Sequence, residues 1–326
     1  MTKFVMLDSH TLPDADFHQE KEILKAAGIE CVLATCKNRD DVISVAKDAD
    51  YLGCNYFHID GSLLKDLPKV KVIVRYGIGY DVVNVEDCTN RKILLCNLPT
   101  YCLEDVATHT MALILDISRK TTLFDREIRA GRWNIGYGYE MHRLSGRTLG
   151  LIGFGNIARK VCTYAQAFGM NVIVSDPFVS NEVVNKYGVQ TVNNDELLQK
   201  ADVISLHCPL TEETKHLINH ETLKKVKKGA LLVNTSRGGL ICNEDLLEAI
   251  NNGIITAAGL DVVEDEPVKS PDHPLLSNER IVITPHCAYN SVEASDEQHC
   301  QVAKTVVTYD KGEIPFNTVN RRKLGL

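Results

Sequence analysis

Long apolar runs are missing from this sequence. No stretch approaches the roughly 18 uninterrupted apolar residues that a membrane-spanning helix needs. Positive charge is not in excess either, since 36 Lys and Arg stand against 43 Asp and Glu and no basic stretch gathers them. Nucleic acid and acidic membranes are therefore not expected partners. The first apolar run ends at Asp8, too early for a signal peptide, so we expect a cytoplasmic protein.

The eleven cysteines lack the spacing of a metal site or a disulfide framework. The sequence has no Cys-x-x-Cys pair and no group of His and Cys at zinc spacing. In a cytoplasmic protein, scattered cysteines are typical of reduced thiols that serve as small apolar residues. We therefore expect no metal site. Internal repeats and low-complexity tracts are also absent.

Short apolar runs separated by amphipathic segments are abundant. This alternation is typical of βα units that build a parallel sheet. Five strand candidates lie in the first hundred residues: KFVML, ECVLA, DYLGC, VKVIVRY and ILLCNLP. Six more follow residue 146: TLGLIGF, NVIVSD, DVISLHCP, GALLVNTS, ITAAGLDV and IVITPH. Because residues 101–131 between the two series hold two helical patterns and no strand, the chain is predicted to form two α/β domains, each with a doubly wound parallel sheet.

The stretch LGLIGFGNIA, residues 149–158, predicts a strand, a glycine turn and the start of a helix. Gly153 and Gly155 allow a tight turn and a close approach of the backbone to a ligand. The first helical residues, Asn156 and Ile157, then offer N–H groups and the positive end of the helix dipole to a pyrophosphate. Ala158 replaces the usual third glycine, whose task is close packing of helix against strand.

Asp176 ends the next predicted strand, 18 residues after Ala158. A carboxylate at this point accepts hydrogen bonds from the ribose hydroxyls of a dinucleotide and repels a 2′-phosphate. A solvated aspartate at a strand end is the alternative interpretation. The order of strand, turn, helix, strand and acid favours a binding site for NAD over one for NADP.

Three polar stretches follow later strands of the second series: VNTSRGGLI with Arg237, GLDVVEDEP with Asp261 and acids at 264–266, and ITPHCAY with His286. Taken singly, each is explained by a solvated loop. Together they suit the reduction of a 2-oxo acid, in which an imidazolium donates a proton and a carboxylate orients it. A guanidinium holds the substrate carboxylate through paired hydrogen bonds. We therefore predict catalytic roles for Arg237, Glu266 and His286.

The sequence resembles the D-isomer-specific 2-hydroxyacid dehydrogenases. The motifs that carry the resemblance stand in family order over nearly the whole chain: VRYGIGYDVVN, GLIGFGNIA, HCPLTEETKHLI, LLVNTSRGGLICNEDLLEAI, GLDVVEDEP and ITPHCA. Within the family the chain is most similar to the branch that includes phosphoglycerate dehydrogenases and C-terminal-binding-protein dehydrogenases. The resemblance implies a Rossmann-type NAD domain, residues 101–292, inserted into a flavodoxin-like substrate domain, residues 1–100 plus 293–326.

The resemblance also implies roles for individual residues. It selects Glu266 over Glu264, because the family's acid directly precedes the proline, here Pro267. The implied cofactor contacts are Ile78, Gly153, Gly155, Asn156, Ile157, Asp176, Cys208, Pro209, Thr214, Thr235, Ser236, Arg237, Asp261 and His286. The implied substrate contacts are Tyr76, Gly77, Ile78, Asn55, Arg237 and Tyr289, with the loop at residues 76–79 binding the carboxylate through its backbone N–H groups.

The expected activity is the NAD-dependent interconversion of a 2-oxo acid and a D-2-hydroxy acid, with a homodimer expected by resemblance. The alternative is an NAD(H)-sensing, co-repressor-like binding protein that keeps the dehydrogenase fold. The sequence has no long disordered tail for recruiting partners, which favours the enzyme. The identity of the 2-oxo acid is not fixed by the sequence.

Overall fold

The computed structural model describes residues 2–12, 17–264 and 266–326. The chain divides into two compact units, which are described one at a time. Unit 1 comprises Met1–Tyr101 and Ser291–Leu326, and unit 2 comprises Cys102–Asn290. Unit 2 is therefore inserted between two segments of unit 1.

Unit 1 contains a five-stranded sheet in the order β2-β1-β3-β4-β5, with every pair parallel. Its strands are β1 (Thr2–Met6), β2 (Ile29–Leu33), β3 (Tyr51–Cys54), β4 (Val72–Arg75) and β5 (Leu94–Cys96). This order is that of flavodoxin-like folds, in which the chain reverses its direction of progress across the sheet after β2. The predicted flavodoxin-like sheet is confirmed.

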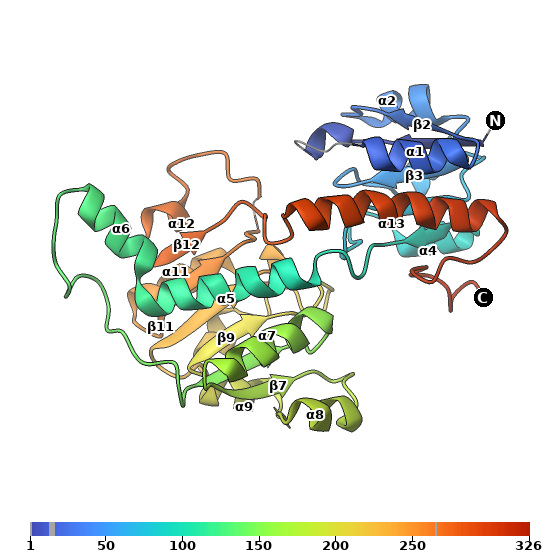
Figure 1. Ribbon diagram of the computed structural model, residues 1–326. Helices are drawn as coiled ribbons and strands as arrows, with labels where there is room; N and C mark the ends of the chain where they lie inside the picture. The colour runs from blue at the N-terminus through green and yellow to red at the C-terminus, as the bar shows by residue number, and fades with distance from the viewer. Residues whose placement is uncertain (1, 13–16, 265) are drawn as a thin grey trace. The chain divides into compact units, whose positions relative to one another are not determined.

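Helices cover both faces of the sheet in unit 1. The helical segments are a 3₁₀ turn (Ser9–Thr11), α1 (His18–Ala26), α2 (Arg39–Ala46), α3 (Gly61–Leu64), α4 (Val85–Asn90) and α13 (Val292–Asp310). The long helix α13 lies beside α1 and also contacts β4 (Figure 1). On the other face, side chains of α2, α3 and α4 pack with alternate strand residues in one buried cluster, which includes Val5, Leu52 and Ile73.

Unit 2 contains a seven-stranded parallel sheet in the order β12-β11-β10-β9-β6-β7-β8. Its strands are β6 (Thr148–Ile152), β7 (Asn171–Ser175), β8 (Gln190–Thr191), β9 (Val203–Leu206), β10 (Ala230–Asn234), β11 (Ile255–Leu260) and β12 (Ile281–Ile283). The order reverses between β6 and β9, as in dinucleotide-binding Rossmann sheets, whose ligands bind at that reversal. The predicted Rossmann-type sheet is confirmed.

The helices of unit 2 also form two layers. They are α5 (Leu103–Arg119), α6 (Thr121–Arg129), α7 (Asn156–Ala167), α8 (Asn181–Tyr187), α9 (Asn194–Lys200), α10 (His220–Leu223), α11 (Asn243–Asn251), α12 (Pro274–Ser277) and a 3₁₀ turn (Gly238–Leu240). Helices α5 and α7 lie side by side over one sheet face (Figure 1). Leu149 and Leu151 of β6 belong to the core cluster on that face, whereas Ile204 and Leu206 of β9 belong to the cluster that packs against α9 to α12.

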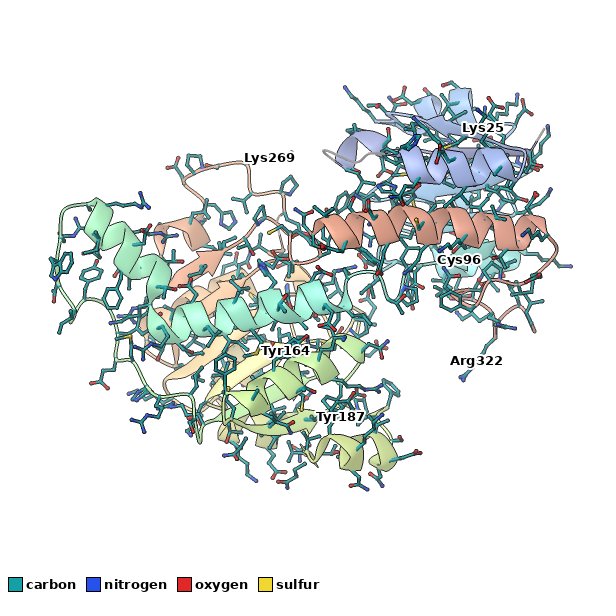
Figure 2. All side chains as sticks on the ribbon, in the orientation of Figure 1. Lys25, Cys96, Tyr164, Tyr187, Lys269 and Arg322 are labelled. Atoms are coloured by element: carbon teal, nitrogen blue, oxygen red, sulfur yellow. The ribbon has the colours of Figure 1, made fainter. Side chains whose placement is uncertain are left out.

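All eleven predicted strands are present, and the two helical patterns of residues 101–131 are α5 and α6. The sequence analysis missed only one strand in the described part of the chain, β8, whose two residues are both exposed. A strand this short and polar leaves no apolar run to detect. Figure 2 labels Tyr187 at the end of the neighbouring α8. The ring of Tyr187 meets the ring of Phe154 edge-on, with the centroids 5.5 Å apart.

Candidate functional site

The carboxyl ends of the strands in unit 2 lie in one row. Ile152 of β6 pairs with Ser175 on one side and Leu206 on the other, and the row continues through Asn234 and Leu260. The last partner of Leu260 is Ile283 of β12. Each of these residues ends its strand, so the segments that follow them emerge at one edge of the sheet. Those segments carry Gly153, Asp176, Cys208, Thr235, Arg237, Asp261 and His286.

The glycine turn after β6 is shaped to accept a ligand. Gly153 has φ +92°, and an added Cβ would lie 2.7 Å from the carbonyl of His207, so only glycine fits there. Gly155 is the N-cap residue of α7, and a Cβ added there would meet no atom within 4 Å. The space beside the N-cap of α7 is therefore open, as the approach of a pyrophosphate to this helix start requires. Asn156 is exposed and Ile157 is half-buried at this helix start.

Asp176 stands directly after β7, beside the glycine turn. Its Oδ2 accepts a hydrogen bond from the backbone N–H of Phe154 at 2.7 Å, and its Oδ1 accepts one from Phe178 N–H at 2.8 Å. These bonds fix the half-buried carboxylate next to the turn. Each carboxylate oxygen has a second lone pair, which is the acceptor that a ribose hydroxyl needs. The residues of the turn and Asp176 thus fit the adenosine half of NAD.

His286 and Glu266 are brought together although 20 residues separate them. His286 Nδ1 lies 2.7 Å from Glu266 Oε1, and the two side chains are 24% and 33% exposed, so solvent reaches the pair. Glu264 instead contacts His216, at 2.8 Å. Asp265, the third acid of this run, lies outside the described residues. The loop that carries the acids continues to Lys269, which Figure 2 labels.

Arg237 lies between β10 and the 3₁₀ turn, and its Nη1 donates a hydrogen bond to the carbonyl of Ser236 at 2.8 Å. The next residue explains how its loop meets the loop of the acids. An added Cβ on Gly238 would lie 2.0 Å from the carbonyl carbon of Val263, so the two backbones touch there. This close approach places Arg237 and Glu266 on adjoining loops at the same sheet edge.

Asp261 has a task that the sequence analysis did not predict. Its side chain is 1% exposed, and both oxygens accept hydrogen bonds from the segment around His286. The donors are the Thr284 hydroxyl at 2.5 Å and the backbone N–H groups of Cys287 and Ala288, each at 2.9 Å. The predicted cofactor contact of this carboxylate stays a prediction beside this structural role. Asp261 holds the segment on which His286 adopts the positive φ of +52°.

The remaining predicted cofactor residues of unit 2 lie on the same edge but use their side chains within the protein. Thr214 Oγ1 donates to the carbonyl of Pro209 at 2.7 Å and closes the loop that follows Cys208. Thr235 Oγ1 is 2.8 Å from Thr110 Oγ1 of α5, and Ser236 Oγ donates to the carbonyl of Leu206 at 2.9 Å. These hydroxyls shape the loops. Tyr289, predicted to contact substrate, is half-buried in the segment after His286.

In the loop of unit 1 that is predicted to bind a carboxylate, two N–H groups donate hydrogen bonds within the protein. Tyr76 is 1% exposed, and its N–H donates to the carbonyl of Cys54 at 2.8 Å. The N–H of Gly77 donates to the carbonyl of Arg75 at 2.9 Å, which makes a tight turn. Both N–H groups thus have acceptors within unit 1. The predicted contact of residues 76–79 to a substrate carboxylate stays a prediction, and the next N–H of the loop belongs to Ile78. That residue is half-buried, and Asn97 Nδ2 fixes its carbonyl at 2.7 Å.

Asn55, predicted to contact the substrate, is held in a buried turn. It is 4% exposed, its N–H donates to Asp8 Oδ1 at 2.9 Å and its Nδ2 donates to Thr11 Oγ1 at 3.1 Å. The Asp8 carboxylate binds the N–H groups of the two following residues as well, at 2.6 and 2.8 Å. The short, polar Asn55 side chain thus belongs to a buried turn, and its contact with a substrate stays a prediction.

Arg75 is a candidate that the sequence analysis missed. It is 8% exposed, and its Nε donates to the carbonyl of Asn55 at 3.2 Å. Its Nη1 lies against Gly77, where an added Cβ would be only 1.8 Å away. Among the described residues, neither Nη atom has a recorded hydrogen bond or ion pair. The Nη atoms are not among the buried atoms that lack a partner, so they are accessible. The place of this cation in the apolar run VKVIVRY was the available signal.

Comparison with known proteins identifies the family of this chain. The family model described as "D-isomer specific 2-hydroxyacid dehydrogenase, NAD binding domain" matches residues 111–288. The chain belongs to this family. A glyoxylate reductase of Korarchaeum cryptofilum is 36% identical over 296 residues, which cover 89% of this chain and 85% of that protein. A D-3-phosphoglycerate dehydrogenase of Methanocaldococcus jannaschii is 37% identical over 301 residues, 92% of this chain and 57% of that protein.

Solved structures of similar proteins match nearly the whole length of the chain. A D-lactate dehydrogenase from Aquifex aeolicus, crystallised with NAD and lactic acid, superposes with a TM-score of 0.85 at 29% identity. The match covers 98% of this chain and 99% of that one. The protein is therefore an NAD-dependent D-2-hydroxyacid dehydrogenase, and unit 2 is its NAD-binding domain. Within the described residues, no helix has the length and apolar character to cross a bilayer.

Proposed function

We propose that this dehydrogenase interconverts a 2-oxo acid and a D-2-hydroxy acid, with His286 and Glu266 moving the proton and Arg237 holding the substrate carboxylate. The 2.7 Å contact between His286 Nδ1 and Glu266 Oε1 carries the proposal. When bound, NAD supplies or accepts the hydride at its nicotinamide ring. The chain's own residues then have to manage one proton and one carboxylate.

His286 handles the proton through its second ring nitrogen. In the direction of reduction, the imidazolium donates the proton from Nε2 to the carbonyl oxygen as that carbon becomes an alcohol carbon; oxidation reverses the transfer. Glu266 accepts the Nδ1–H hydrogen bond, which orients the ring and stabilises its positive charge. The backbone that carries the ring is fixed beforehand, because the backbone N–H of His286 donates to the carbonyls of Asp261 at 2.8 Å and Thr284 at 3.0 Å.

The substrate carboxylate requires donors, and each unit offers one kind. In unit 2, Arg237 presents a planar guanidinium, whose paired N–H groups match a carboxylate. In unit 1, the donors are the Ile78 N–H and the Nη atoms of Arg75. Arg75 supports this part of the proposal because its buried guanidinium lies against the loop without an anionic partner among the described residues.

NAD is proposed to bind along the edge formed by the glycine turn and Asp176. The N–H groups at the start of α7 receive the pyrophosphate, and the Asp176 carboxylate receives the ribose hydroxyls. The same carboxylate disfavours NADP, since a 2′-phosphate would bring a second anion to it. Asp176→Ser should therefore lower the preference for NADH over NADPH.

The first test is turnover of a panel of 2-oxo acids, including glyoxylate, pyruvate and hydroxypyruvate, with NADH and with NADPH. Steady NADH oxidation with at least one acid, and a chiral product of D configuration where the product has a stereocentre, is expected. Tight NADH binding without turnover of any acid would instead support the co-repressor-like alternative.

The second test compares two neighbouring glutamates. Glu266→Gln should lower kcat about 100-fold, because the neutral amide does not stabilise the imidazolium and accepts the Nδ1–H hydrogen bond of His286 more weakly than a carboxylate does. Glu264→Gln is the matched control, since Glu264 contacts His216 instead, and its kcat should stay within about twofold of the wild type. Equal kcat values for the two variants would refute the role of the His286–Glu266 pair.

For the quaternary structure we propose a homodimer that buries the segment after α6. Trp133 and Ile135 are 87% and 86% exposed in the single chain, and Ile128 of α6 is 47% exposed. Such a concentration of large apolar side chains is unusual on a monomer surface. The segment is anchored, because Lys120 Nζ donates to the carbonyls of Tyr137 at 2.5 Å and Tyr139 at 2.8 Å.

Light scattering tests the dimer. Trp133→Ser combined with Ile135→Ser should shift the protein to a monomer at micromolar concentration. Phe178→Ser removes a side chain that is 94% exposed elsewhere on unit 2, and that variant should keep the mass of the wild type. A wild-type protein of single-chain mass would contradict the proposal.

A further inference from the structure

Unit 1 contains a buried polar network that the proposed reaction does not use. It joins Glu20 of α1, Tyr76 after β4 and His299 of α13, which are 0%, 1% and 2% exposed. Tyr76 Oη donates to Glu20 Oε1 at 2.6 Å, and Glu20 Oε2 lies 2.8 Å from His299 Nδ1. Burial and the Glu20 carboxylate raise the pKa of Tyr76 well above its ordinary value, so the phenol keeps its proton and donates.

The network ends at the loop proposed to bind the carboxylate. Tyr76 stands between Arg75 and the turn at Gly77 and Ile78. Its carbonyl accepts a hydrogen bond from Gln298 Nε2 of α13 at 3.3 Å, and its N–H donates to the carbonyl of Cys54. Side chain, carbonyl and N–H are thus all held, two of them by groups on α1 and α13. The ring has little freedom, since an added Cβ on Gly53 would lie 2.7 Å from Tyr76 Cε2.

Packing alone does not require an imidazole at position 299. His299 Nε2 is buried and has no hydrogen-bond partner, which is unfavourable for a polar nitrogen. The ring meets Phe17 edge-on at 4.6 Å, a contact that a phenyl ring would make equally well. The imidazole therefore costs stability at Nε2, and the group it serves is the Glu20 carboxylate at Nδ1.

We infer that Glu20 and His299 are positioning residues for substrate binding. They hold the Tyr76 side chain, and through it the place of the Ile78 N–H and the Arg75 guanidinium. This inference rests on the proposed function of that loop. A displaced loop weakens a contact that the carboxylate makes in the ground state and in the transition state alike, so KM should rise while kcat stays unchanged.

Tyr76→Phe tests the inference, and Tyr51→Phe is its matched control. Tyr51 is also 2% exposed, and its hydroxyl donates to Asp310 Oδ1 of α13 at 2.8 Å. It therefore makes the same kind of bond, from a tyrosine hydroxyl of the same sheet to a helix carboxylate, but to α13 instead of α1 and at a strand start far from the loop in sequence. Tyr76→Phe should raise the KM for the 2-oxo acid about tenfold, with kcat and the Kd of NADH unchanged. Tyr51→Phe should leave all three at wild-type values.

Binding of oxamate, an unreactive 2-oxo-acid analogue, to the NADH-loaded protein gives a readout without turnover. Its Kd, measured by calorimetry, should rise about tenfold for Tyr76→Phe and stay unchanged for Tyr51→Phe. If wild-type protein turns over no 2-oxo acid, the proposed function fails, but oxamate binding still tests the network. If turnover is normal and both variants share the wild-type KM and oxamate Kd, the inference is wrong.

His299→Phe covers the case in which Tyr76→Phe does not fold. It keeps the ring packing on Phe17, but it also removes the Nδ1 partner of the buried Glu20 carboxylate, so the melting temperature should fall. A KM raised several-fold at an unchanged kcat, in protein that is still folded at the assay temperature, supports a positioning role. A wild-type KM would overturn it and leave His299 as a packing residue.

Discussion

At the scale of single residues, the two positions of the turn after β6 require glycine for different reasons. Gly153 is required by the protein itself, because its φ of +92° and the nearby His207 carbonyl exclude a side chain. Gly155 has an ordinary φ of −72° and no atom within 4 Å of an added Cβ. Nothing in the described chain requires glycine at position 155, so the bound cofactor has to supply the reason.

Gly155→Ala should therefore weaken NADH binding without weakening the fold. Alanine fits the backbone there, and the methyl group takes the space proposed for the pyrophosphate. We expect the Kd of NADH to rise about tenfold or more, measured by fluorescence titration, at an unchanged melting temperature. Gly153→Ala is the contrasting variant, and it should lower the melting temperature as well. An unchanged Kd in Gly155→Ala would place the cofactor elsewhere.

At the scale of elements, the proposed catalytic groups meet because neighbouring loops touch. The register that joins Asn234, Leu260 and Ile283 brings three strand ends level. The contact of Gly238 with the Val263 backbone then brings the loop after β10 onto the loop after β11. Asp261 fixes the segment after β12 with three hydrogen bonds. Three loops are thus locked to one another at the sheet edge.

Gly238→Ala should disturb the contact between the loop after β10 and the loop after β11. Its Cβ would lie 2.1 Å from the carbonyl oxygen of Val263, and a backbone cannot move aside as a side chain does. We expect a loss of about 1–3 kcal/mol in the free energy of unfolding, measured in urea, together with a lower kcat. Gly239→Ala provides the comparison, because its Cβ would meet only the Leu210 side chain, at 3.1 Å. Equal losses in both variants would argue against a specific loop contact.

At the scale of the whole molecule, acid should act on stability through His207. Burial lowers the pKa of this imidazole to about 4, and its Nε2 lies 2.9 Å from Ser205 Oγ. In the unfolded chain the histidine takes up a proton near pH 6.5, whereas the folded protein takes it up only near pH 4. The contribution of the neutral His207 to the free energy of unfolding is therefore fully present above pH 6.5 and is lost as the pH falls towards 4.

Protonation of His207 should lower the free energy of unfolding by at most about 3 kcal/mol between pH 6.5 and pH 4. Urea unfolding of the wild type and of His207→Asn at pH 7.5, 6.0 and 5.0 measures it. The variant, which has no imidazole to protonate, should show a flatter dependence on pH than the wild type. Parallel curves would mean that other groups cause the acid sensitivity.

The sequence by itself determined the two sheets and the order of the motifs. Buried parallel strands are covered on both faces, so each leaves a continuous apolar run, and the polar residues directly after those runs mark the binding edge. For that reason Asp176, Arg237 and His286 could be picked out without a structure. The two-residue strand β8 could not, because both of its residues are exposed.

Only the tertiary structure decided which polar groups are already in use. Hydrogen bonds between residues far apart in the chain occupy Asp261, Asn55 and the Tyr76 N–H, and no local pattern reports them. The same long-range packing left Arg75 buried against Gly77 and joined Tyr76 to two helices, one from each end of the chain. A sequence shows which residue types are present, but a hydrogen bond is satisfied in three dimensions, so availability for a substrate is a property of the fold.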